Sequence, residues 1–109
     1  MPTTRYSCSE IPLMIEELIE IIKKLKGKIT DDSDMVWTGY ETSKQLRDEL
    51  EAYILELQAG NATSMEKIKT LLLPTGALQE HSISNRWGDE FLDLSEKFDH
   101  LYMRIKHQN

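Results

Sequence analysis

The acidic cluster most suggestive of chemistry is formed by Glu16, Glu17 and Glu20. Carboxylate oxygens are the ligands that Mg²⁺ prefers, so these side chains could bind such an ion. On a helix they would lie opposite an apolar stripe that runs from Ile11 to Leu25. An exposed helix face has a similar composition, and Glu20 precedes Lys24 at the i,i+4 spacing that favours an ion pair. The cluster therefore has two interpretations, a metal site and a solvated surface.

The EExxE spelling of residues 16–20 resembles the first metal motif of the all-α nucleoside triphosphate pyrophosphohydrolases. The resemblance implies a Mg²⁺- or Mn²⁺-dependent hydrolase in which Glu16, Glu17 and Glu20 hold the metal. That family also carries an ExxD motif on the next helix. Here the second expected helix has no such spelling, and the nearest ones begin at residues 90 and 96. A hydrolase of this type is the alternative function.

The sequence contains no other pattern typical of catalysis. None of its three histidines follows a glutamate at position i−3, as the di-iron bundle motif requires. The single cysteine, Cys8, falls in a segment that we expect to be loose, where a nucleophile is poorly held against a base. A glycine-rich phosphate loop is also missing. The sequence thus predicts no catalytic residue and no cofactor, and it favours a non-catalytic protein over an enzyme.

The segment from Pro74 to Gly88 is the least periodic part of the chain and carries many polar side chains. Functional residues often lie in such connections, and Arg and Trp are enriched where proteins meet. In the other interpretation, Trp87 begins the apolar stripe of the last helix and the polar groups cap helix ends. The candidate partner-binding residues are Gln79, Glu80, His81, Asn85, Arg86 and Trp87.

Apolar residues recur at helical spacing in three segments, Ile11–Leu25, Leu46–Leu57 and Trp87–Ile105. Shorter helical patterns occur between residues 63 and 78, and the alternating β-branched runs of a sheet are missing. The predicted fold is all-α, a small bundle of three long amphipathic helices plus one or two short helices.

Capping residues predict where the long helices begin. Ser9 is suited to cap the first helix, which places Pro12 at its third position, where no N–H is needed. Thr38 and Glu41 have the spacing of a capping box for the second helix. Asn85 is suited to cap the last helix.

Length and charge place the chain in a broad class. Its 109 residues suit one domain, which we expect over residues 9–106, with loose tails at 1–8 and 107–109. A net charge of −6 argues against nucleic acid as the main partner. The sequence has no apolar run long enough to span a membrane and no apolar segment typical of a secretory signal, which predicts a cytoplasmic protein.

We therefore expect a non-catalytic protein-interaction module, an adaptor, a regulatory subunit or an immunity-type inhibitor, that acts through an acidic helical surface. Its partner would be another protein, and a basic surface would associate fastest with it. The acidic surplus is largest over residues 41–59, so a basic partner should approach the second helix first. A homo-oligomer is also plausible, since the first helix is apolar over a wide arc that includes Met14, Ile19 and Ile21.

Overall fold

In the computed structural model the chain folds into five helices and no strand over the described residues, 3–36, 38–61, 63–73 and 76–107. Side chains are described for residues 12–36, 38–61, 63–73 and 76–106. The prediction of an all-helical fold is confirmed over this part of the chain. The helices are α1 (Thr3–Gly27), α2 (Ser43–Gln58), α3 (Ser64–Leu72), α4 (Ala77–Ser84) and α5 (Gly88–His107).

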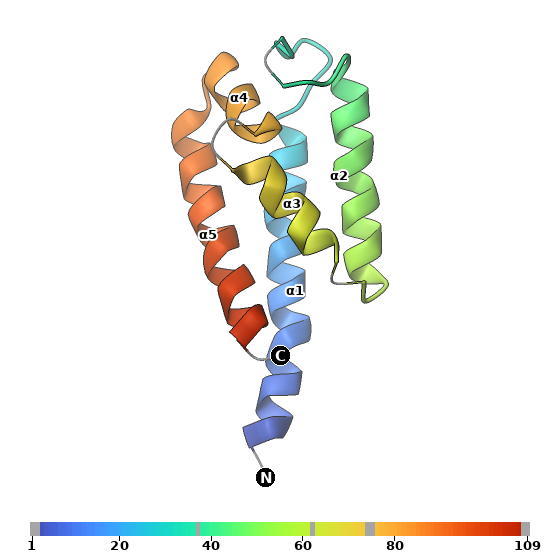
Figure 1. Ribbon diagram of the computed structural model, residues 1–109, viewed down its shortest axis with the longest axis vertical. Helices are drawn as coiled ribbons and strands as arrows, with labels where there is room; N and C mark the ends of the chain where they lie inside the picture. Colours follow the sequence, from blue (N-terminus) through green and yellow to red (C-terminus); the bar gives the residue numbers. More distant parts are fainter. Residues whose placement is uncertain (1–2, 37, 62, 74–75, 108–109) are drawn as a thin grey trace.

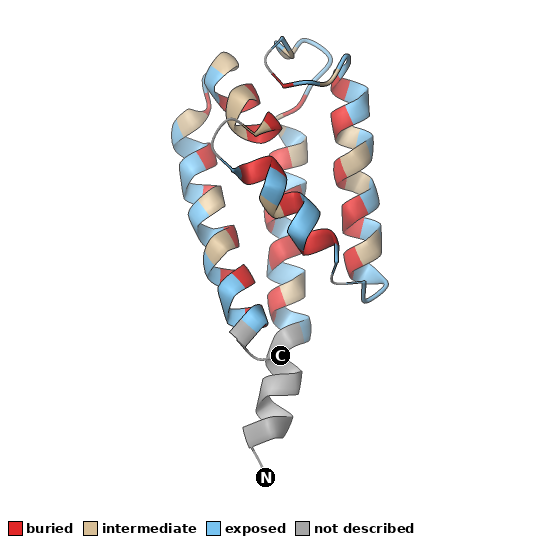
Figure 2. Cartoon of the chain, viewed as in Figure 1, coloured by how far each residue is buried: buried red, intermediate tan, exposed pale blue. Residues whose placement is uncertain are grey.

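The helix α1 lies between α2 and α5 and packs against both (Figure 1). It runs upward in this view, whereas α2 and α5 run downward. The short helix α3 crosses the front of the bundle, and α4 covers its upper end. The buried side of each long helix faces the middle of the bundle (Figure 2). All five helices thus contribute to one hydrophobic core.

The core follows the apolar stripes of the sequence. Leu18, Ile22 and Leu25 on α1 are fully buried, and so is Phe98 on α5. Burying one such side chain contributes about 1.5–3 kcal/mol to folding. The helical spacing therefore identifies the faces that hold the bundle together.

The helix α1 begins earlier than the sequence predicts. It starts at Thr3 instead of after Ser9, so Pro12 lies inside the helix and not at its third position. A helix can extend through polar residues because each added residue closes a further backbone hydrogen bond. Residues 1–2 and 108–109, and the side chains of residues 3–11 and 107, lie outside the described part. The loose tails expected at residues 1–8 and 107–109 therefore stay predictions.

The helix α2 begins with a capping box at Thr42 and Gln45, four residues after the predicted one. The Gln45 backbone N–H donates to Thr42 Oγ1 over 3.2 Å, and Gln45 Oε1 accepts from the Thr42 backbone N–H over 3.3 Å. Thr38 instead closes a local turn, in which its hydroxyl donates to the Met35 carbonyl over 2.8 Å. The prediction of Thr38 as the cap was wrong because Thr38 Oγ1 accepts from the nearby Tyr40 backbone N–H over 3.1 Å and the chain turns at Gly39, whose φ is 83°, before α2 begins.

Asn85 ends α4 and does not begin α5. Its backbone N–H donates to the His81 carbonyl over 3.0 Å, and α5 begins three residues later, at Gly88. The predicted cap was wrong because the chain first makes a tight turn through Arg86. Within the described residues, no helix has the length and apolarity needed to cross a membrane.

Candidate functional site

The carboxylates of the EExxE run do not point into one site. Glu16 lines a groove between α1 and the end of α2, whereas Glu17 lines a different groove between α1 and α5. Glu20 borders both grooves and forms an ion pair with Lys23 at 3.5 Å, not with Lys24 as the spacing predicts. Among the residues with described side chains, no three His, Cys, Asp or Glu residues are arranged to hold a metal ion.

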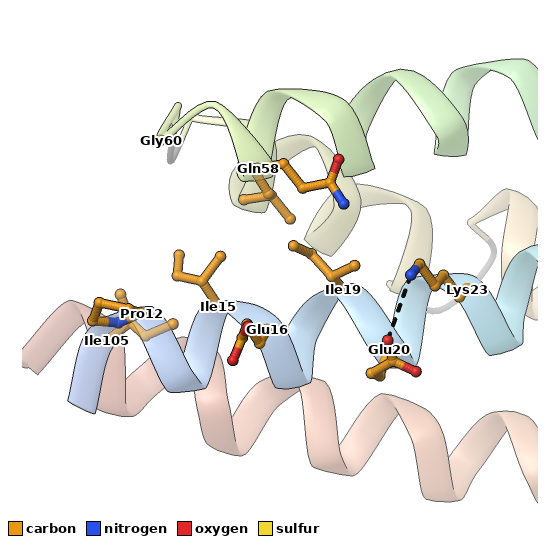
Figure 3. A pocket seen from close by; sticks show the side chains of 10 residues that line it. Pro12, Ile15, Glu16, Ile19, Glu20, Lys23, Gln58, Gly60 and Ile105 are labelled. Carbon is orange, nitrogen blue, oxygen red and sulfur yellow. Dashed lines mark ion pairs between the residues drawn. The ribbon is translucent and has the colours of Figure 1, made fainter. Parts of the chain in front are cut away.

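The first of these grooves, the α1–α2 groove, has a volume of about 820 Å³ (Figure 3). Ile15 and Ile19 point from α1 toward the end of α2, and Glu16 and Glu20 follow one another along α1. The charged groups of its lining are two carboxylates and one ammonium group, that of Lys23. The lining residues are Pro12, Ile15, Glu16, Ile19, Glu20, Lys23, Leu57, Gln58, Gly60 and Ile105.

The groove exists because the helices differ in length. With 25 residues α1 is about 37 Å long, whereas the 16 residues of α2 extend for only about 24 Å. The apolar stripe of α1 therefore continues past the point where α2 ends. Ile15 lies there and is only half-buried, although Leu18 and Ile22 on the same stripe are fully buried.

Helix polarity adds negative potential where α2 ends. Gln58 and Gly60 at the C-terminal end of α2 line the groove, and the last carbonyls of a helix carry partial negative charge, whereas the positive N-terminal end of α1 lies nine residues before Pro12. The carboxylate of Glu16 adds a full charge and has no ion-pair or hydrogen-bond partner among the described residues. The groove thus combines an apolar floor with a negative rim.

The second helix is less available to a basic partner than its composition suggests. Glu51 pairs with Lys26 at 2.7 Å, and Asp48 pairs with Lys44 at 2.6 Å. Glu56 accepts a hydrogen bond from Ser64. Glu49 accepts hydrogen bonds from Tyr40 and Tyr53. Among the acidic residues of the segment 41–59, Glu41 alone has a side chain without a hydrogen-bond or ion-pair partner in the described part of the chain.

The two tyrosines share the carboxylate of Glu49. The Tyr40 hydroxyl donates to Oε1 over 2.7 Å, and the Tyr53 hydroxyl donates to Oε2. Burial and then the bond to Glu49 raise the pKa of both tyrosines well above the ordinary value. Both hydroxyls thus stay protonated and act as donors, so the cluster fixes the loop before α2 and is not a source of acid or base near neutral pH.

The predicted partner-binding segment divides into buried and exposed residues. His81 is completely buried and Trp87 is 6% exposed, so both belong to the core. The Trp87 indole N–H donates to His81 Nδ1 over 3.0 Å, and the two rings meet edge to face with centroids 5.5 Å apart. The burial of Trp87 therefore supports the interpretation that it begins the core stripe of the last helix.

The remaining residues of this segment reach the surface to different extents. Arg86 is exposed, whereas Gln79, Glu80 and Asn85 are half-buried. The side chain of Asn85 already binds the loop before α2, because its oxygen accepts from the Asp34 backbone N–H over 2.8 Å. Binding by these residues stays a prediction. Sequence reasoning missed Ile83, an apolar residue that is 61% exposed, because α4 shows no clear apolar stripe.

Sequence reasoning also missed the α1–α2 groove, although it selected Glu16 and Glu20 for another purpose. The relevant signal is the extra apolar turn that the stripe of α1 has beyond the stripe of α2. The spacing of each stripe does not show where one helix meets another. The contact between the end of α2 and Ile15 and Ile19 is tertiary, so the groove could not be predicted from the spacing.

Comparisons of the chain with protein-family models, curated proteins and solved structures found no significant match.

Proposed function

We propose that the chain is a non-catalytic protein-interaction module that holds a basic amphipathic helix of another protein in the α1–α2 groove. An adaptor, a regulatory subunit and an immunity-type inhibitor are all forms of such a module. In this proposal the long amphipathic helices α1, α2 and α5 form the rigid part, and the protein acts in the cytoplasm. The observation that carries the proposal is the apolar floor of the groove beside the carboxylates of Glu16 and Glu20.

The apolar floor supplies the affinity. An amphipathic helix places residues at i, i+3, i+4 and i+7 into such a groove, and each square ångström of apolar surface removed from water contributes about 25 cal/mol. Pro12 is exposed and Ile15 is half-buried, so both have surface that a partner would cover. A helical partner fits because it would take the place along α1 where α2 has ended.

Charge determines which helix binds. The rim carries Glu16, which has no partner among the described residues, and Glu20, which is paired with Lys23, and the C-terminal end of α2 adds partial negative charge. The whole chain has a net charge of −6, which speeds association with a basic partner at low salt. An acidic helix of the same shape would be repelled, so the proposal is specific for Lys- or Arg-rich partners.

The metal-dependent hydrolase remains the second candidate, supported by the EExxE spelling. Its geometry is less favourable, because Glu16 and Glu17 line different grooves and Glu20 is paired with Lys23. A divalent ion needs several oxygen ligands converging on one point. We therefore rank it below partner binding.

The proposal is tested with a synthetic helical peptide that has Leu on one face and Lys on the other. Isothermal titration calorimetry should detect binding to the wild-type protein, and a peptide with Glu in place of Lys should not bind. The charge reversals Glu16→Lys and Glu20→Lys should each weaken binding about tenfold, which corresponds to about 1.4 kcal/mol. Glu41→Lys is the matched control, since Glu41 is exposed at the other end of α2.

Two outcomes would contradict this function. If Glu41→Lys weakens binding as much as Glu16→Lys, the peptide recognises the overall charge and not the groove. If sedimentation equilibrium shows a dimer that the Lys-rich peptide does not dissociate, a second copy of the chain covers the groove instead.

A further inference from the structure

The hydrogen bond between Trp87 and His81 fixes which imidazole nitrogen of His81 carries the proton. Because Nδ1 of His81 accepts from the Trp87 indole N–H, the neutral imidazole carries its proton on Nε2. This Nε2 atom is buried and has no hydrogen-bond partner within the described part of the chain. His81 is therefore a completely buried imidazole with one satisfied nitrogen and one unsatisfied donor.

A second proton cannot be accommodated in this arrangement. It would bind to Nδ1, which then faces the indole N–H as a second donor, and the hydrogen bond to Trp87 would be lost. The resulting imidazolium would be buried without an acceptor at either nitrogen, which strongly disfavours the packed arrangement of His81 and Trp87. The packed arrangement thus disfavours protonation of His81.

Asn85 links His81, near the end of α4, to the loop before α2. The Asn85 side-chain amide donates to the His81 carbonyl over 2.9 Å and to the Asp34 carbonyl over 3.0 Å. Its oxygen accepts from the Asp34 backbone N–H over 2.8 Å. A movement of the end of α4 would therefore break the contacts that hold Asp34.

We propose that protonation of His81 opens the α4–α5 corner, residues 81–87, and releases the loop around Asp34 with it. The device is independent of the α1–α2 groove, which lies at the other end of the bundle (Figure 1). In the open form Trp87 would become accessible to solvent. The chain would thereby respond to mild acidification without complete unfolding.

The charged groups around His81 leave it with little compensation. Asp34 is the group whose negative charge acts on the imidazole, and it favours the protonated form. On the helices packed against α4, the carboxylates of Glu66 on α3 and Glu90 on α5 have other partners, since Glu66 binds Tyr102 and Lys106 and Glu90 pairs with Lys28. The other charged side chains of α4, of α3 and of the first turn of α5 are Glu80, Lys67 and Lys69, and Asp89. Lys69 is paired with Asp99.

The direction of the pH effect follows from burial. Burial lowers the pKa of His81 below its ordinary value, and the charge of Asp34 opposes part of this shift. The corner is therefore fully stable above the ordinary histidine pKa of about 6.5. Below that pH the open form binds a proton and the closed form does not, so the opening equilibrium rises up to about tenfold per pH unit until the lowered pKa is reached.

Amide hydrogen exchange followed by NMR tests the proposal on the full chain. Protection factors, which correct for the intrinsic pH dependence of exchange, should fall for the Asn85 and Trp87 amides between pH 7 and pH 5. Amides in the middle of α2, such as that of Leu50, should keep their protection over the same range. The variant His81→Gln can still accept from Trp87 but does not titrate, and it should abolish the pH dependence.

The matched control is His100→Gln, which replaces an exposed histidine of α5 and should leave the pH dependence intact. If His81→Gln does not fold, the wild-type protein still decides the question. Constant protection at the corner from pH 7 to pH 5 would overturn the proposal. It would also be overturned if α2 lost protection in parallel, because the opening would then be global.

Discussion

Gly60 and Arg86 occupy the same position at the ends of two different helices, and both have left-handed backbone conformations. Their φ angles are 89° and 66°. In each case the following N–H donates back five residues, from Asn61 to the Glu56 carbonyl over 2.8 Å and from Trp87 to the Ser82 carbonyl over 2.9 Å. Glycine is the usual residue there because it has no Cβ, so Arg86 places strain at the corner next to His81.

The first prediction is that Arg86→Gly stabilises the protein. A non-glycine residue in the left-handed region costs about 1–2 kcal/mol, and the substitution should recover about 1 kcal/mol of that in urea unfolding. The matched change Gly60→Ala should lose a similar amount. No gain from Arg86→Gly would mean that the arginine side chain compensates for its backbone conformation.

The second prediction concerns the burial of Trp87. Trp87→Ala should reduce the free energy of unfolding by about 3–5 kcal/mol, the usual range for a large buried aromatic residue. Trp87→Phe keeps most of the packing but leaves His81 Nδ1 without its donor, which should cost about 1–3 kcal/mol. Chemical denaturation measures both values. A loss below about 1 kcal/mol for Trp87→Ala would indicate an exposed anchor instead of a core residue.

The third prediction is that Glu49→Ala lets Tyr40 and Tyr53 ionise at lower pH. Burial and the bonds to Glu49 raise the pKa of both groups in the folded protein. Unfolded tyrosines ionise near pH 10, so these two destabilise the folded state as the pH rises above that value. Ultraviolet absorbance of the phenolate should show the change, whereas Tyr102, which binds Glu66, should titrate as before. Identical titrations of wild type and variant would contradict the shared-carboxylate cluster.

The helical stripes made much of the fold predictable from the sequence. The apolar stripe of α5 is buried from Trp87 to Ile105, and that of α1 is buried from Leu18 to Leu25, because an amphipathic helix turns its apolar face toward the core. The helix starts were less predictable. Thr38 and Asn85 both have side chains suited to capping, yet the backbone N–H of Tyr40 in one case and of Asp34 in the other occupies the side-chain oxygen.

The candidate sites were predictable only in part. Glu16 and Glu20 were identified as functional candidates, but the spacing alone cannot show that Glu16 and Glu17 border different grooves. His81 and Trp87 share a segment with exposed polar residues, and their burial depends on the turn at Arg86. Such features arise from contacts between helices and have no periodic signal in the sequence.

The fourth prediction is that divalent metal ions do not stabilise the protein. A ligand that binds only the folded state raises the melting temperature with its concentration. Because Glu16, Glu17 and Glu20 do not converge, Mn²⁺ and Mg²⁺ should leave the melting temperature of wild type and Glu17→Ala alike unchanged. A metal-dependent increase that Glu17→Ala abolishes would support the hydrolase instead.

The fifth prediction tests the central claim, that the α1–α2 groove holds a basic amphipathic helix. The measurement is an NMR titration of the labelled protein with the Lys-rich peptide, in which backbone amide shifts report the contact surface. We predict that the largest shifts fall on Ile15, Glu16, Ile19, Gln58 and Gly60, and that Glu16→Lys reduces them. Shifts centred on the α4–α5 corner, or spread evenly over all acidic helices, would contradict the account.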